Sequence, residues 1–313
     1  SLLEKRSSLL RPNREKEPLK ALAAVAAVCA PALSSPALAQ DAKSLPYSFV
    51  PKTGVFIGAG GSFNWDWFDQ SLQGVSGVTD VLIGPNLVAD GQAGGPPANF
   101  DRDDSGLAFD AELGYVQRLG DGPWLGGIKF SYKYLNLASD DHNISIPQEG
   151  SFTTTGGTPV TIPFMGFVPI RTSQIKIRNQ LALIPYVGRS FGRFYLYAGG
   201  GPALFDIESE IIDAVGFAEI GGNTVSVTGE PANFSSSDWV WGGAAQVGVD
   251  YYLAPTWFLD ANYTFAQSAE YKIKYSSPFT NQNGPLTSEG TANLFARQQV
   301  TSHSFGITLN KVF

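Results

Sequence analysis

Eight segments between residues 53 and 313 alternate apolar side chains with polar or small ones. This period of two is typical of β-strands that present one apolar face. In the clearest segment, 105–119, Phe109 and Leu113 share one face, and Asp110 and Glu112 share the other. The other segments are 53–65, 123–135, 175–189, 193–205, 238–252, 256–266 and 300–313. The pattern predicts an all-β protein with eight antiparallel strands.

Charged side chains gather on the polar face of these segments, which is the reverse of the pattern expected for a soluble β-sandwich. An apolar exterior around a charged interior is typical of a transmembrane β-barrel. We therefore predict a closed eight-stranded barrel whose lumen contains a charge network. Its predicted members are Asp110, Glu112, Lys129, Lys133, Arg178, Asp250 and Asp260.

Two segments are less regular. In 175–189 we expect Ile175, Ile177, Leu181, Leu183 and Val187 to face outward. In 193–205 both faces are apolar or small, so its facing stays open.

The connections between the segments alternate in length. Short ones lie near 120–122, 190–192 and 253–255, and long ones span about 66–104, 136–174, 206–237 and 267–299. Outer-membrane barrels have short periplasmic turns, long external loops and both termini in the periplasm. Ten strands are the structural alternative, in which 78–88 or part of the third long loop enters the membrane.

Aromatic residues cluster at the ends of the predicted strands. With the first strand running outward, an outer group forms from Trp65, Trp67, Trp239 and Trp241. An inner group forms from Trp124, Trp257 and Tyr251, near Phe313. Two such groups predict the aromatic girdles that mark both membrane interfaces.

The N-terminus predicts export. Residues 1–39 combine a basic region, a short apolar run and the small-residue site Ala37-Leu38-Ala39, as a cleaved signal peptide does. Residues 40–52 would form a short periplasmic segment before a barrel of 53–313. Cleavage would remove Cys29 and leave no cysteine. The remainder would carry 15 basic and 25 acidic side chains, a net charge of −10 that disfavours a nucleic-acid partner.

Two stretches carry a family resemblance. The last segment alternates through Phe305 and ends in Phe313, and it resembles the C-terminal signal of outer-membrane barrels. Residues 185–188 and 197–201 are similar to the glycine-rich hairpin of small porin-like and opacity-type barrels. An OmpA-type transmembrane domain is close in layout. The resemblance implies a Gram-negative outer membrane, contact with its lipid and lipopolysaccharide, and insertion by the barrel-assembly machinery.

The lumen charges predict a specific contact. Pairing Arg118 with Pro123 would place Glu112 opposite Lys129, with Cβ atoms about 5 Å apart. We prefer a structural plug, because an eight-stranded barrel is only just wide enough for its own side chains. An ion gate is the alternative. A register that pairs Glu112 with another residue would argue against both interpretations.

Catalytic and metal sites are not predicted. His303 lies between Ser302 and Ser304, and neighbouring strand residues point to opposite faces, so no triad is marked. Acidic clusters at 101–104 and around His142 lack the glycine and closing glutamate of a calcium-binding loop and are read as solvated.

The sequence therefore predicts a porin-like outer-membrane protein that needs no cofactor and is not an enzyme. Its role would be structural, in envelope integrity, with external loops available for adhesion or for an external ligand. A narrow passive solute pore is the first alternative, and a lipid-modifying enzyme is the second.

Overall fold

The computed structural model describes residues 50–313, apart from the side chains of 73–76. The predicted signal peptide and nearly all of the predicted 40–52 segment lie outside the described residues. In the part that is described, no helix is long and apolar enough to span a membrane.

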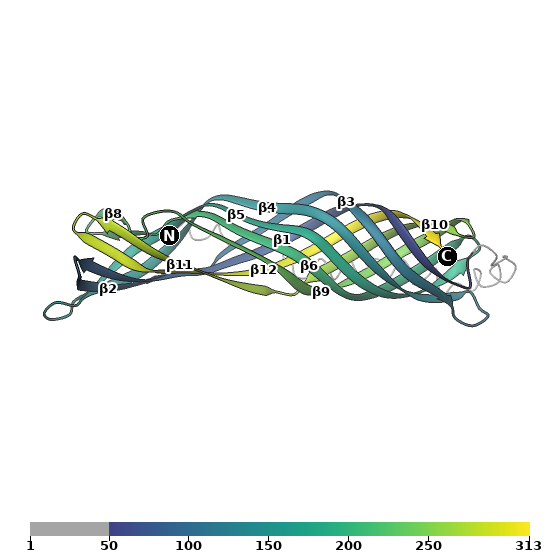
Figure 1. Cartoon of the computed structure of the whole chain (residues 1–313), viewed down its shortest axis with the longest axis horizontal. Helices are drawn as coiled ribbons and strands as arrows, with labels where there is room; N and C mark the ends of the chain where they lie inside the picture. The colour runs from purple at the N-terminus through teal and green to yellow at the C-terminus, as the bar shows by residue number, and fades with distance from the viewer. Residues whose placement is uncertain (1–49) are drawn as a thin grey trace, which may run out of the picture.

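The described chain forms one antiparallel sheet of twelve strands. The molecule is elongated, and its longest strands run along most of its length (Figure 1). The strands are β1 (Thr53–Ile83), β2 (Asn86–Gly94), β3 (Ala98–Arg118), β4 (Trp124–Thr154), β5 (Thr161–Phe191), β6 (Phe194–Ala214), β7 (Phe217–Ile220), β8 (Asn223–Ser226), β9 (Ala232–Ala254), β10 (Trp257–Ser268), β11 (Tyr271–Asn283) and β12 (Leu286–Val312).

Eight of these strands pair in a ring. Starting from β1, the pairings run through β3, β4, β5, β6, β9, β10 and β12 and return to β1. The start of β1 and the end of β12 are directly paired, with Phe56 opposite Val312. These strands contain the eight segments with alternating polarity, because that pattern gives each strand one buried and one exposed face.

The predicted total of eight strands is wrong, since the described sheet has twelve. The additional strands β2, β7, β8 and β11 lie at the end of the molecule away from the C-terminus (Figure 1). They arise in regions predicted to be long loops, where the ring strands continue and fold back as hairpins. For example, β1 continues to Ile83, turns at Gly84, and returns as β2. Strand pairing satisfies the backbone groups of these segments, which irregular loops would leave to water.

We call the part of the sheet beyond the eight alternating segments the outer extension. In it, β2 pairs with both β1 and β4, and β11 pairs with β12. Residues 78–83, which the ten-strand alternative would place in the membrane, pair with 286–291 at the tip of this extension.

The facing of β5 differs from the prediction at its start. Leu183 and Val187 are exposed as expected, but Ile175 and Ile177 are buried. A register shift between Ile177 and Asn179 interrupts the pairing of β5 with β6. An extra residue in one strand turns the following side chains to the other face, so a single parity cannot hold along the whole strand.

Three buried apolar clusters follow one another along the length of the molecule, two in the ring and one in the outer extension. The first, near the start of β1 and end of β12, includes Phe56, Tyr186, Tyr195 and Tyr252. The second is built around Ile177, Ile184, Phe205 and Val300. The third lies in the outer extension and contains Leu72, Ile144, Ile146, Val168, Ile170, Ile211, Ile273, Tyr275, Leu294 and Ala296.

Candidate functional site

Lys129 is the centre of a buried charge network inside the ring. Its Nζ lies 2.7 Å from Asp260 Oδ2 and 3.3 Å from Glu112 Oε1, and it donates a 3.0 Å hydrogen bond to the Tyr197 hydroxyl. The three charged side chains come from β4, β10 and β3, and each is at most 5% exposed. A buried charge needs such partners, because an unpaired one is strongly disfavoured in a low-dielectric interior.

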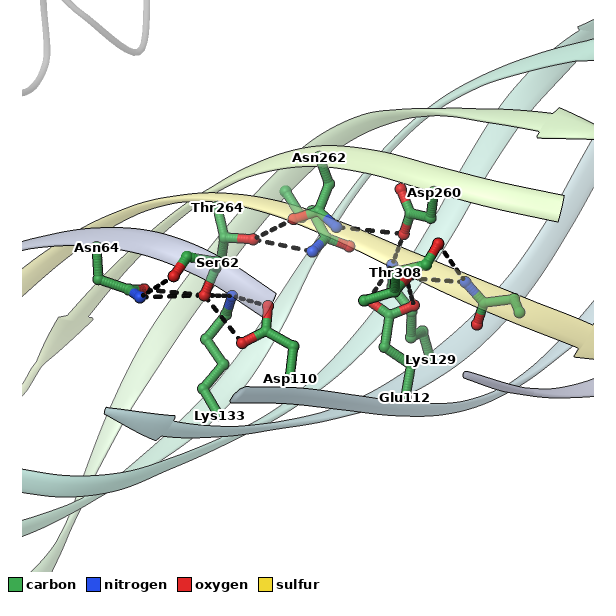
Figure 2. A network of polar contacts seen from close by, with 12 residues as sticks. Ser62, Asn64, Asp110, Glu112, Lys129, Lys133, Asp260, Asn262, Thr264 and Thr308 are labelled. Carbon is green, nitrogen blue, oxygen red and sulfur yellow. Dashed lines mark hydrogen bonds and ion pairs between the residues drawn. The ribbon is translucent and has the colours of Figure 1, made fainter. Parts of the chain in front are cut away.

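Lys133 forms a second group two positions along the same face of β4, beyond Ser131. Its Nζ lies 2.8 Å from Asp110 Oδ2, and Ser62 Oγ donates to Asp110 Oδ1 at 2.9 Å. Asn64 Nδ2 donates to Ser62 Oγ at 3.0 Å. Figure 2 shows this group beside the Lys129 group, with both inside the strands.

Uncharged polar side chains surround the carboxylates of the Lys129 group (Figure 2). Tyr197 donates to Asp260 at 2.9 Å, and Thr308 Oγ1 donates to Glu112 Oε2 at 3.2 Å. Gln246 Nε2 donates to Thr264 Oγ1 at 2.8 Å, and Asn262 Nδ2 donates to Asp260 Oδ2 at 3.3 Å. The two groups therefore hold five charged side chains from β3, β4 and β10: Lys129 with Glu112 and Asp260, and Lys133 with Asp110.

The predicted register of β3 and β4 is wrong by two residues. Glu112 is opposite Ser131, and Asp110 is opposite Lys133. The hairpin is wider than predicted, because Arg118 pairs with Leu125 and the Leu119 amide donates to the Trp124 carbonyl. Pro123 has no N–H to donate across the hairpin, and its carbonyl accepts a hydrogen bond from the Ser190 amide on β5.

A shift of two residues keeps every side chain on its face, so Glu112 still reaches Lys129 along the diagonal. The ion pair between Glu112 and Lys129 therefore forms although the two residues are not directly opposite each other. A long lysine side chain bridges a diagonal pair, whose Cα atoms are farther apart than those of a direct pair.

Of the two remaining predicted members of the network, Asp250 lies in the lumen and Arg178 does not. Arg178 lies outside the ring: its side chain is 43% exposed and pairs with Glu208, because the register shift at 177–179 reverses the facing there. Asp250 is buried across from Asp260 on the neighbouring strand. The lumen thus holds Asp110, Glu112, Asp250 and Asp260 against Lys129 and Lys133.

Apolar clusters close the lumen on both sides of the charges. Toward the short turns, Tyr186, Tyr195 and Tyr252 pack with Phe56 and Phe258. Toward the outer extension, Phe205, Ile177 and Val300 are each fully buried. The charges therefore lie in a polar layer between two buried apolar clusters.

Sequence reasoning did not identify the tyrosines of this layer, because the facing of 193–205 was left open. Tyr197 lies over Gly248 of the neighbouring strand, where an added Cβ would come within 2.5 Å of the Tyr197 hydroxyl. Phe56 lies in the same way against Gly114. The glycines on inward positions were the available signal, since a glycine inside a barrel leaves room for a ring from the next strand.

The predicted girdle residues point outward. Trp65, Trp124, Trp239, Trp241 and Trp257 are between 39% and 63% exposed. Trp67 packs edge-on against His303, and Tyr251 packs against Phe194. The predicted assembly-signal residues Phe305 and Phe313 are also exposed.

The two histidines are not brought near a nucleophile and acid. His303 Nδ1 contacts the Tyr263 hydroxyl at 2.6 Å on the outside, whereas Ser302 and Ser304 are buried on the lumen side. His142 Nδ1 lies 3.1 Å from Thr172 Oγ1. Among residues 50–313, no group of three or more His, Cys, Asp or Glu side chains is arranged to hold a metal ion.

The acidic clusters of the outer extension are divided between its faces. Asp141 is buried and accepts a 2.8 Å hydrogen bond from Arg102 Nε, while Asp140 is exposed and accepts from Gln174. This hydrogen bond, together with the charge of Asp141, raises the pKa of the Arg102 guanidinium, so Arg102 stays charged. Asp101 and Asp103 are exposed.

No protein-family profile matches the sequence. Nor does any characterised protein match it by sequence.

Among solved structures, the chain is similar to the outer membrane protein OprG from Pseudomonas aeruginosa, with 12% identity over 81% of this chain and 96% of that one and a TM-score of 0.30. For Neisserial surface protein A, identity is 11%, coverage 79% and 97%, and the TM-score 0.25. For Ail, the attachment invasion locus protein of Yersinia pestis, the values are 12%, 77% and 98%, and 0.23. At such TM-scores the likeness carries no argument about this chain.

Proposed function

We propose that the ring of eight strands is a closed barrel that spans a bacterial outer membrane, and that its role is structural. The lumen is plugged, and the outer extension is displayed outside the cell for interaction. Both ends of the ring, at β1 and β12, would lie in the periplasm.

The distribution of side chains around the ring carries this proposal. Along the paired strands, Val55, Ile57, Leu107, Phe130 and Ile307 are between 42% and 82% exposed. Lysines and carboxylates are buried behind them. In water this arrangement is unfavourable on both faces, but in a bilayer the apolar exterior contacts lipid.

The height of the apolar exterior also fits a membrane. On β1 the exposed apolar side chains extend from Val55 to Trp65. This is about 33 Å along the strand and about 25 Å along the axis at the usual tilt, which equals the ~25 Å apolar band of outer-membrane barrels.

A structural role is favoured over the pore alternative, because aromatic and aliphatic side chains fill the ring on both sides of the charges. A lipid-modifying enzyme is disfavoured, because Ser302 and Ser304 face away from His303. The interaction role rests on the size of the outer extension, since binding functions concentrate on exposed segments.

Cysteine labelling in cells tests the placement. Ser276→Cys puts a thiol on the exposed face of β11, and Asp121→Cys puts one in the short β3–β4 turn. In intact Gram-negative cells we expect a membrane-impermeant maleimide to label the first variant. The second should be labelled only after the outer membrane is opened.

The unsubstituted protein controls for any retained Cys29. Equal labelling of both variants in intact cells, or recovery of the protein in the soluble fraction, would contradict the proposal.

A further inference from the structure

The outer extension encloses an apolar cavity that the structural role does not use. Its volume is about 260 Å³, and it lies between β5, β9, β11 and β12. A smaller cavity of about 50 Å³ adjoins it and shares Val168, Gly216, Phe279 and Ala292 as lining residues. Together they form a chamber at the end of the molecule away from the charge network.

Apolar side chains form the floor and walls of this chamber. Val168, Ile170 and Leu294 belong to the buried cluster of the outer extension, and Phe234 packs against that cluster. Phe279 stands opposite Gly290, where an added Cβ would come within 2.8 Å of its ring. The absence of a side chain at Gly290 therefore leaves space for the Phe279 ring in the wall.

The segment that covers the chamber is held in place by side chains. Asn281 Nδ2 and Asn283 Nδ2 both donate to the Ser226 carbonyl, at 2.8 and 2.9 Å. Thr228 Oγ1 accepts from the Gly216 amide at 2.9 Å. The wall formed by 226–231 is thus fixed before any ligand arrives, and a preformed site loses less conformational entropy on binding.

Polar groups of the larger cavity lie on its open side, whereas the smaller cavity is also lined by the buried side chains of Thr79 and Gln148. Glu230 and Thr280 line the larger cavity and are exposed to solvent. A dry cavity of about 150 Å³ lined by aliphatic and aromatic side chains binds benzene, so a larger one accommodates a bicyclic aromatic or a similar apolar molecule.

We propose that this chamber binds a small uncharged apolar molecule of about ten to fourteen heavy atoms, a size set by the ligand sizes that such volumes hold. The site deepens the interaction role of the outer extension, and its access from outside the cell rests on the proposed placement. The sealed layers below it mean that the molecule is captured and does not pass through the ring.

Binding of 1-fluoronaphthalene to the refolded full chain in nanodiscs tests the site by fluorine NMR, with empty nanodiscs as the background. We expect saturable binding to the unsubstituted protein. Ala292→Trp and, from the opposite wall, Ala214→Phe should each weaken binding at least tenfold by filling the chamber.

Thr291→Trp is the matched control, since neighbouring strand residues face opposite sides, and it should bind like the unsubstituted protein. Binding no stronger than to empty nanodiscs, or equal binding by the filled variants, would overturn the site. If neither filled variant folds, crystals soaked with 1-bromonaphthalene decide: bromine in the chamber supports the site, and bromine elsewhere or nowhere overturns it. None of these failures affects cysteine labelling, so the membrane role is tested separately.

Discussion

The ring and the outer extension share the long ring strands but have opposite cross-sections. In the ring, Leu113 and Ile307 face outward and Lys129 and Glu112 face inward. In the outer extension, charged residues such as Lys272, Lys274, Asp140 and Glu149 are exposed, and isoleucines and leucines fill the interior. The ring therefore has apolar side chains outside and charged ones inside, whereas the outer extension has charged side chains outside and an apolar interior.

Under the proposed membrane placement, the solvent around each region accounts for this difference. Apolar side chains would face lipid in the ring, and they face the interior in the outer extension, where water would be the solvent. β5 passes from one regime to the other, and its register shift at 177–179 is where the buried parity changes.

The largest expected effect is the loss of a buried charge partner in the ring. Lys129→Ala leaves Glu112 and Asp260 buried without an ammonium group. Removing one partner of a buried ion pair typically costs 3–5 kcal/mol, so we expect a loss of about 4 kcal/mol in the free energy of unfolding. Urea unfolding in lipid vesicles, followed by tryptophan fluorescence, measures it.

The double variant Lys129→Met/Asp260→Asn is the control, because it removes opposite charges together. It should recover at least half of the loss. A single variant as stable as the unsubstituted protein would show that the lumen is open to water.

An intermediate effect is expected from a positive charge on the exterior, and its size should depend on the region. Phe109→Arg places a guanidinium near the middle of the apolar band, because the exposed Phe109 pairs with Gly61, midway between Val55 and Trp65. It should reduce the free energy of unfolding by about 2–4 kcal/mol, the cost of arginine near the bilayer midplane. Ser276→Arg, on the exposed face of β11, should change it by less than about 0.5 kcal/mol. Similar costs at both positions would remove the distinction between the two regions.

The smallest effect is expected at an ion pair of the outer extension. Arg102 is 58% exposed where it pairs with Asp141. Solvent screens such a pair, so Arg102→Ala should leave the urea midpoint unchanged within error, in contrast to Lys129→Ala. A loss comparable to that of Lys129→Ala would mean that exposure does not separate the two pairs.

The fold was predictable where each side chain faces one solvent along a whole strand. Alternation in 105–119 and 256–266 predicts Asp110, Glu112 and Asp260 on the polar face, and all three are buried. Such strands need only a period of two, which a single sequence displays.

The errors occur where a local backbone feature changes the count. Pro123 widened one hairpin and shifted the register by two, and the bulge beside Arg178 turned that residue out of the lumen. In 175–189 the odd positions are apolar on both sides of the bulge, so the period of two shows no break there. The strands of the outer extension were not predicted, because their apolar side chains face the interior and not the exterior, unlike those of the ring. The contacts of Tyr197 were not predicted, because the alternation in 193–205 does not show which face points inward.

Single-channel recording in a planar bilayer tests the central claim, that the ring is a plugged membrane barrel. Folding of the purified protein is first confirmed by the difference in gel mobility between boiled and unboiled samples. The account predicts insertion without steady current, since apolar layers close the lumen on both sides of the charges. Steady channels whose conductance changes in Lys129→Ala would contradict it and would make the buried charges the lining of a pore.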